Sequence, residues 1–182
     1  MIRYIAFLRA INVGGHTVTM DRLRTLFEEL GHSKVETFIA SGNVIFESRS
    51  KNTAALAKAI EVHLKAALGY EVSTFLRTDA EIAAIATYEP ASKKILASAT
   101  AFVVGFLAEP LSLESTKAIL ALKTDSDYFH VHGTEIYWVC KTKQSDSTFS
   151  NAAFERITKT KATFRGMNTV RRLAAKYGKQ TV

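Results

Sequence analysis

The chain has 182 residues, of which 47% are hydrophobic and 23% are charged. This composition is typical of one medium or two small packed domains, and it excludes a chain that is disordered throughout. Apolar stretches such as residues 101–108 are far shorter than the roughly 20 residues that span a bilayer, and the first residues lack a secretory signal pattern. We therefore expect a cytoplasmic protein without a membrane segment.

Positive charge is concentrated in the second half. The net charge is +7; residues 1–90 hold ten basic and ten acidic side chains, whereas residues 91–182 hold fourteen and seven. Ten of the basic residues lie from residue 141 onward, against only Asp146 and Glu155. Such a block attracts phosphates, nucleic acid or an acidic partner through its long-range field. It is equally consistent with a solvated face that keeps the protein soluble.

Hydrophobic periodicity in the first half predicts a strand, a helix, two strands, a helix and a strand. These elements are residues 4–8, 20–30, 35–40, 44–47, 56–68 and 71–77. Thr19 is placed to cap the first helix and Gly31 to end it. The two middle strands form a hairpin around the turn at residues 41–43. A capping-box spacing at Thr78 and Glu81 then predicts a further helix toward Tyr88.

The second half repeats this order. The corresponding segments are residues 101–107, 112–123, 128–132, 135–141, 151–157 and 161–165, with a last helix over 170–177. The sequence therefore predicts an α+β fold of two tandem ferredoxin-like (α-β plait, βαββαβ) units. Each unit would have an antiparallel sheet with its helices on one face, and extra helices would follow each unit. The expected domains are residues 1–90 and 91–182, related by duplication.

Polar and glycine residues crowd the first strand-to-helix connection, where Arg9, Asn12, Gly14 and Gly15 occur together. Neither the P-loop nor the dinucleotide-binding glycine pattern is present. An arginine and an amide beside flexible backbone are nevertheless suited to a carboxylate or phosphate. The alternative is a tight corner in which the glycines serve backbone geometry and Asn12 bonds its own backbone.

Two histidines, His130 and His132, alternate on a predicted strand, so their rings leave the same face. Cys140 should point to the opposite face, which leaves a zinc site without a third ligand, and we predict no metal and no cofactor. Tyr128 and Tyr137 should share the histidine face. These rings could stack nucleobases, although the RNA-recognition signature is absent; alternatively they are half-buried or packed against another sheet.

Two stretches carry a family resemblance: LRAINVGG at residues 8–15 and SGNVIF at residues 41–46. They resemble the bacterial "domain of unknown function 1697" family, whose members open with LRGINVGG and carry SGNVxF on the following hairpin. Ala10 stands where glycine is usual. Toward the C-terminus Ser147, Asn151, Arg165 and Thr169 match the family pattern, while its Lys, Asn and Trp are missing. The resemblance implies two α-β plait units and no established activity.

From these patterns we expect a non-enzymatic binding protein for an anionic ligand, either nucleic acid or a nucleotide. The predicted ligand-binding residues are Arg9, Asn12, Gly14, Gly15, Ser41, Gly42, Asn43, Asn151 and Arg165. A predicted basic patch comprises Arg171, Arg172, Lys176 and Lys179. Two alternatives remain: an enzyme acting on a small phosphorylated or carboxylated substrate that Arg9 anchors, or a protein-interaction module. The oligomeric state is not predicted.

Overall fold

The computed structural model describes residues 1–178, which form eight strands, seven α-helices and one short 3-10 helix. The fold is α+β, as predicted, with two four-stranded antiparallel sheets. The chain divides into two compact units, Met1–Ala83 with Tyr177, and Ala84–Lys176, so that the division lies within α3 (Asp79–Thr87). Within residues 1–178, no helix combines the length and the apolar character needed to cross a membrane.

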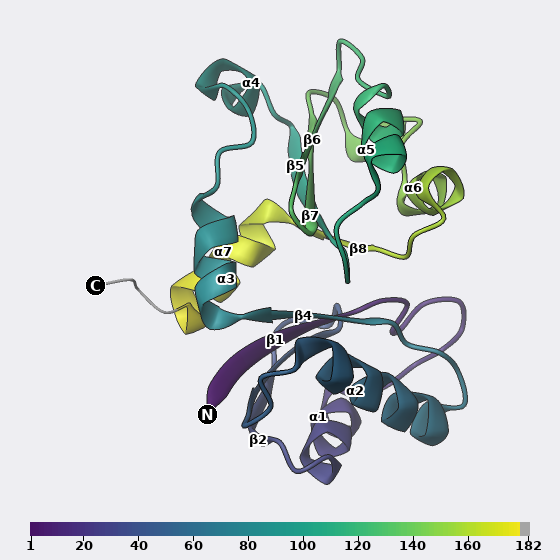
Figure 1. Ribbon diagram of the computed structural model, residues 1–182, viewed down its shortest axis with the longest axis vertical. Coiled ribbons are helices and arrows are strands. Elements are labelled where there is room, and N and C mark those ends of the chain that lie inside the picture. Colours follow the sequence, from purple (N-terminus) through teal and green to yellow (C-terminus); the bar gives the residue numbers. More distant parts are fainter. Residues whose placement is uncertain (179–182) are drawn as a thin grey trace. The chain divides into compact units, whose positions relative to one another are not determined.

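The first unit has one sheet, with α1 and α2 together on one side of it (Figure 1). The strand order is β2-β3-β1-β4, and every neighbouring pair is antiparallel. Its elements are β1 (Ile2–Leu8), α1 (Met20–Glu29), β2 (Ser33–Thr37), β3 (Asn43–Ser48), α2 (Thr53–Leu68) and β4 (Thr74–Thr78). Six of the predicted elements are therefore present in the predicted order.

The core of this unit lies between the sheet and its two helices. Tyr4, Ala6 and Leu8 point from β1 into this core, where they meet Phe27 of α1 and Ile60 of α2. The intervening β1 residues are buried as well, so all of residues 4–8 are at most 1% exposed. A strand that is covered on both faces reads as a continuous apolar run, which is the pattern of this segment.

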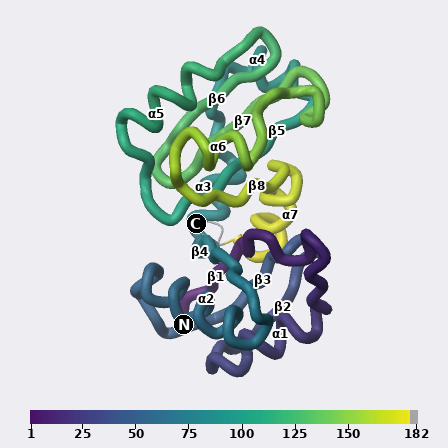
Figure 2. The backbone as a smooth tube through the Cα atoms, turned by 90° about the vertical axis from the view of Figure 1, so that its right-hand side faces the viewer, coloured from purple at the N-terminus to yellow at the C-terminus, as the bar shows by residue number. Residues whose placement is uncertain are grey.

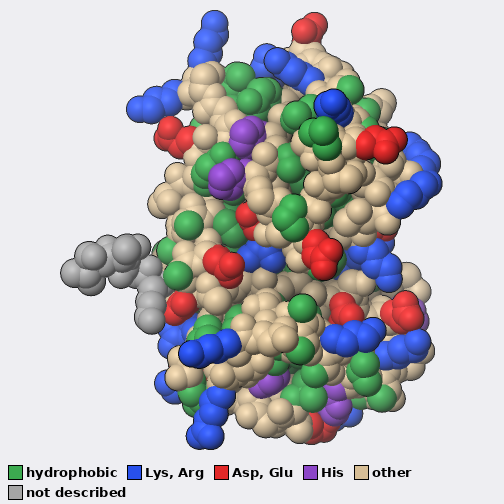
Figure 3. Space-filling view, in the orientation of Figure 1, with side chains coloured by type: hydrophobic (Ala, Val, Ile, Leu, Met, Phe, Trp, Pro, Cys, Tyr) green, Lys and Arg blue, Asp and Glu red, His purple; other side chains and the backbone are tan. Residues whose placement is uncertain are grey.

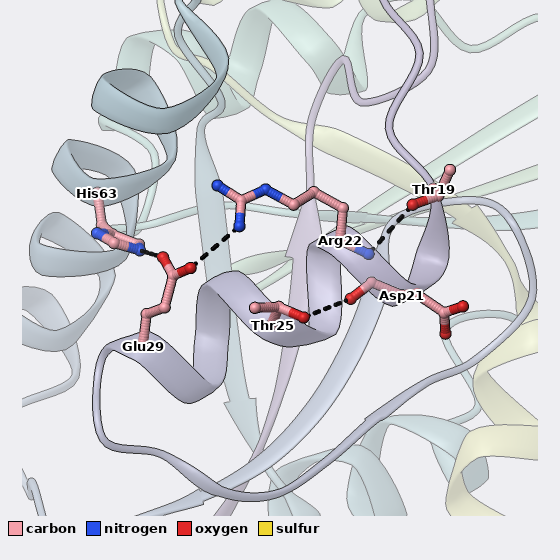
Figure 4. A network of polar contacts seen from close by, with 6 residues as sticks. All are labelled: Thr19, Asp21, Arg22, Thr25, Glu29 and His63. Atoms are coloured by element: carbon pink, nitrogen blue, oxygen red, sulfur yellow. Dashed lines mark hydrogen bonds and ion pairs between the residues drawn. The ribbon is translucent and has the colours of Figure 1, made fainter.

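Helix α1 begins at the predicted cap and is linked to α2 by charged side chains (Figure 4). The Thr19 hydroxyl accepts a hydrogen bond from the backbone N–H of Arg22 at 3.1 Å. Glu29, at the last turn, accepts from the Arg22 guanidinium at 3.0 Å and lies 2.9 Å from the His63 ring on α2. These contacts are exposed, so they orient the helix ends and contribute little stability.

The second unit repeats the arrangement with strand order β6-β7-β5-β8, and the tube in Figure 2 follows the chain through it. Its elements are α4 (Lys93–Ala97), β5 (Ala101–Phe106), α5 (Leu113–Leu120), β6 (Asp127–His132), β7 (Glu135–Cys140), α6 (Asn151–Thr158), β8 (Thr163–Gly166) and α7 (Met167–Tyr177). Ser112 caps α5, as its position before the helix predicts. The sequence did not predict α4, which is only five residues long.

Aromatic side chains dominate the core of the second unit. Trp138 and Phe149 meet edge-on at 4.9 Å between ring centroids, and Phe154 of α6 packs in the same cluster. The indole N–H of Trp138 donates to the buried carboxylate of Asp127 at 2.8 Å, which satisfies both polar groups inside the core. Cys140 is fully buried in this cluster, where it packs among apolar side chains.

Candidate functional sites

The β1–α1 loop, residues 9–19, is built on left-handed backbone. Four of its residues have positive φ: Ala10 at 62°, Asn12 at 55°, Gly14 at 63° and Gly15 at 85°. The Oδ1 atom of Asn12 accepts a hydrogen bond from the Val18 N–H at 2.6 Å, which closes the loop ahead of α1. The amide oxygen of Asn12 therefore serves the backbone of its own loop.

The β2–β3 turn, residues 38–42, lies against this loop. The Gly42 carbonyl accepts from the Leu8 N–H at 2.8 Å, and a Cβ on Gly42 would stand only 2.4 Å from the Ile11 side chain. Only glycine therefore fits at this close approach of turn and loop. The structure thus brings the predicted residues of the two motifs together at one end of the first sheet.

Asn43 is fully buried beneath this turn and holds it together. Its Nδ2 atom donates to the Phe38 carbonyl at 3.0 Å and to the Ser41 hydroxyl at 2.8 Å. Arg9 is half-buried, and its backbone N–H donates to the Ser73 carbonyl at 2.9 Å. Local structure thus accounts for the Asn43 amide, whereas the binding role predicted for Arg9, Ser41 and their neighbours stays a prediction.

Asn151 and Arg165 belong to the second unit. Asn151 opens α6, and its Nδ2 atom donates to the Ala162 carbonyl at 3.2 Å, while its buried Oδ1 has no hydrogen-bond partner among residues 1–178. Arg165 donates to the Thr163 hydroxyl at 2.8 Å. Burial lowers the pKa of the Arg165 guanidinium to about 10, so the group is still cationic at neutral pH. Their predicted ligand role stays a prediction.

The predicted basic patch falls on α7. Arg171, Arg172 and Lys176 are exposed there, and the Arg171 guanidinium lies 5.6 Å from the centre of the Phe102 ring. That distance is within the range of a cation–π contact. Lys179, the fourth predicted member, lies outside the described residues.

Rings gather on the outer face of the second sheet in what we call the aromatic–imidazole cluster: Tyr88, Tyr128, His130, His132 and Tyr137. His130 lies directly across from Tyr137 in the β6–β7 register, which confirms that they share a face. The sequence did not predict that Tyr88 belongs to this cluster. Its ring stacks on His132 and on Tyr137, with ring centroids 4.5 Å and 5.0 Å apart. Tyr88 follows α3 and lies 42 residues from His130, so no local spacing signals the contact.

Tyr88 also contacts His130, and the rings of this face differ in how far they are exposed. Its hydroxyl lies 2.9 Å from the Nε2 atom of His130. Burial, and to a smaller extent the charge of His132, lower the pKa of His130. Tyr137 is 1% exposed, so it is no open stacking surface, whereas Tyr88, Tyr128 and His130 are half-buried and His132 is exposed.

A positively charged side chain lies next to the aromatic–imidazole cluster. The Lys123 ammonium lies 5.6 Å above the Tyr128 ring, at the start of β6. In Figure 3 histidine side chains (purple) reach the surface of the second unit among hydrophobic ones (green). Among the described residues, no three histidine, cysteine or acidic side chains converge as metal ligands would. The cluster is therefore suited to stacking and to anion attraction.

These features define an α+β protein built from two tandem four-stranded units. The chain belongs to the family described as protein of unknown function (DUF1697), whose model matches residues 1–137. Among solved structures it is similar to the conserved bacterial protein SP0830 from Streptococcus pneumoniae, with 24% identity and a TM-score of 0.76 over 97% of this chain and 98% of that one. At this identity the likeness concerns the fold alone. No curated protein matches the chain.

Proposed function

We propose that the protein is a non-enzymatic binding protein for an anionic ligand, most specifically single-stranded nucleic acid or a nucleotide. The observation that carries the proposal is the aromatic–imidazole cluster with Lys123 above Tyr128. Proteins that hold single strands combine stacking rings with cations that track the phosphates. The cluster supplies the rings, and the positively charged second half of the chain supplies the field.

The arrangement of rings supports contact with more than one base. His130 and His132 are nearly parallel, 6.5 Å apart, on an edge strand of the sheet, and Tyr88 stacks beside them. An edge strand leaves room for an extended chain to pass along it. Tyr88 and His130 are half-buried and His132 is exposed, so a base can stack on this face without displacing the core.

The proposal includes three finer assignments. Each unit is ferredoxin-like, which its βαββαβ order and the positions of β1 and β5 between two neighbouring strands support. In the first unit we keep Arg9 as an anion contact, because a guanidinium presents planar N–H groups to phosphate. The basic residues Arg171, Arg172 and Lys176 of α7 would attract the ligand over longer distances.

The test is fluorescence anisotropy of labelled single-stranded RNA, single-stranded DNA and duplex DNA across a series of salt concentrations. If about five basic residues contact a single strand, log K should fall with log salt at a slope near −3.5. Mononucleotides as competitors show whether a single base and phosphate suffice. A flat salt response, or no binding to any of these probes at low salt, removes the proposal.

Single substitutions test whether the aromatic–imidazole cluster is the binding site. Lys123→Ala should weaken binding at low salt, whereas Lys58→Ala removes an exposed lysine from α2 and should leave affinity unchanged. His132→Ala should weaken the binding free energy by about 1 kcal/mol or more if the ring stacks a base. His63→Ala, at a histidine on α2, is its control. Equal binding by Lys123→Ala, His132→Ala and the controls would exclude the cluster as the site.

A further inference from the structure

A pocket of about 380 Å³ opens in the first unit, where the α1–β2 connection meets the end of β3. Residues 30–33, residues 47–50 and Met1 line it. Strand register places it far from the β1–α1 loop: Ile2 pairs with Ser48 at this end of β1, whereas Phe7 pairs with Asn43 at the other. Within the first unit, the pocket is therefore separate from the residues predicted to bind a ligand in the β1–α1 loop and the β2–β3 turn.

His32 lines this pocket and carries a buried polar atom. Among the described residues its Nε2 atom has no hydrogen-bond partner, although its ring is held against Phe46 at 4.5 Å between centroids. Burial lowers the pKa of His32, so the imidazole is neutral at neutral pH. Buried polar atoms almost always have partners, because each orphan costs free energy. A ligand group at Nε2 would supply the missing partner.

Glu47 adds an oriented carboxylate. Its Oε1 atom accepts from the Arg3 guanidinium at 3.2 Å and from the Lys34 ammonium at 3.1 Å. The hydrogen bond from Lys34 is the main reason that the pKa of Glu47 is lowered, so the group is ionised. Within the described residues no hydrogen bond reaches its Oε2 atom. The pocket thus has a carboxylate fixed by one oxygen, with the other available to accept.

The chain is shaped to bring these groups together. Lys34 adopts positive φ, at 50°, next to a shift in the β2–β3 register between Ser33 and Glu36. Ser48 accepts a hydrogen bond from the Ser50 N–H, which leaves its hydroxyl proton to donate. Arg49, between them, is exposed at the rim. Arg3 and Lys34 pair with the Glu47 carboxylate, and Arg49 adds a further cation to the pocket lining.

We propose that this pocket binds a small hydroxylated anion, of the class of sugar phosphates and sugar acids. Hydroxyl groups of such a ligand donate to Glu47 Oε2 and bond His32 Nε2. Its acid group lies toward Arg49, where the excess of positive charge outweighs the one carboxylate. The volume is that of a small-metabolite site. A plain polyol would leave the cations unused, and a plain amine would be repelled by them.

The test follows the histidine ring signals of the full chain by NMR during titration with ribose 5-phosphate, gluconate, ribose and inorganic phosphate. The His32 signals should move with ribose 5-phosphate or gluconate, and much less with ribose or phosphate alone. Arg49→Ala should weaken binding by up to about fivefold, and Glu47→Gln should remove the preference for hydroxylated anions. Arg24→Ala, which removes an exposed arginine from α1, is the matched control and should bind as the wild type does.

Several outcomes would overturn this proposal. They are unmoved His32 signals with both acids, equal shifts with inorganic phosphate, or equal affinities for Arg49→Ala and Arg24→Ala. Thermal unfolding of each variant shows that it is folded before its affinity is compared. Lys123→Ala should leave this binding intact, so the outcome is independent of the nucleic-acid test.

Discussion

Backbone strain at the level of single residues is concentrated where the family motif lies. Ala10 and Asn12 in the β1–α1 loop and Ile39 in the β2–β3 turn all have positive φ, which L-residues with a Cβ adopt at a cost. Asn12 offsets this cost with its hydrogen bond to Val18. A β-branched residue such as Ile39 is rarely left-handed, and such outliers persist only where surrounding structure holds them.

At Ala10 the strain explains the family pattern and leads to a prediction. Glycine is usual at this position, and the φ of 62° is one that glycine adopts without steric cost. Ala10→Gly should therefore stabilise the protein by up to about 1 kcal/mol, after allowing for the greater freedom of glycine in the unfolded chain. Urea denaturation of the full chain measures the difference.

The matched control is Ala66→Gly in the exposed face of α2, where backbone geometry is ordinary. That change should destabilise by about 1 kcal/mol. Opposite signs for the two substitutions would establish strain at Ala10. Similar losses of stability in both variants would show that the loop favours alanine.

At the scale of elements, capping residues predict where helices begin. Thr78 and Glu81 form a reciprocal capping box: the Glu81 N–H donates to the Thr78 hydroxyl at 3.2 Å, and the Thr78 N–H donates to Glu81 Oε2 at 2.7 Å. Such boxes satisfy N–H groups that have no partner in the helix itself. The box fixes where β4 ends and α3 begins.

Thr78→Ala should lower the free energy of unfolding by about 1 kcal/mol, because it removes the hydroxyl that caps α3. Thr78→Ser keeps the hydroxyl and should retain most of the stability. Thermal unfolding followed by circular dichroism compares the three proteins. An alanine variant as stable as the serine variant would mean that the cap contributes nothing.

Two elements differ from what the sequence predicts, each for a local reason. Helix α4 has Ser92 as its cap but is too short to show a helical period, so it was missed. Strand β2 ends at Thr37 instead of residue 40, because left-handed Ile39 breaks the extended backbone. The sequence predicts a candidate site at the β1–α1 loop and the β2–β3 turn because each of these motifs is a short continuous stretch. Tyr88 and the His32 pocket arise from contacts between distant segments, which periodicity does not encode.

At the scale of the whole molecule, two units with the same order of elements differ in what they expose. The first half of the chain has no net charge and the second carries all of the excess. Each unit holds one histidine whose pKa burial lowers: His32 in the first and His130 in the second. The two units should therefore respond to acid in the same direction.

Stability should fall as the pH drops below about 6.5, the ordinary pKa of histidine in an unfolded chain. A lowered pKa in the folded state means that the unfolded chain binds more protons in this range, so stability is full above it and is lost on acidification. Each histidine contributes at most about 1.4 kcal/mol per pH unit, and less where solvent reaches the ring. Protonation of His130 also makes its Nε2 atom a hydrogen-bond donor, so the Tyr88 hydroxyl can only accept there, and it places a cation next to His132.

Urea midpoints at about pH 7.5 and pH 5.5 measure this loss for the wild type and for His32→Gln and His130→Gln. Each substitution should reduce the difference between the two pH values, because glutamine takes up no proton. If both variants lose as much stability on acidification as the wild type does, protonation of His32 and His130 is not its cause.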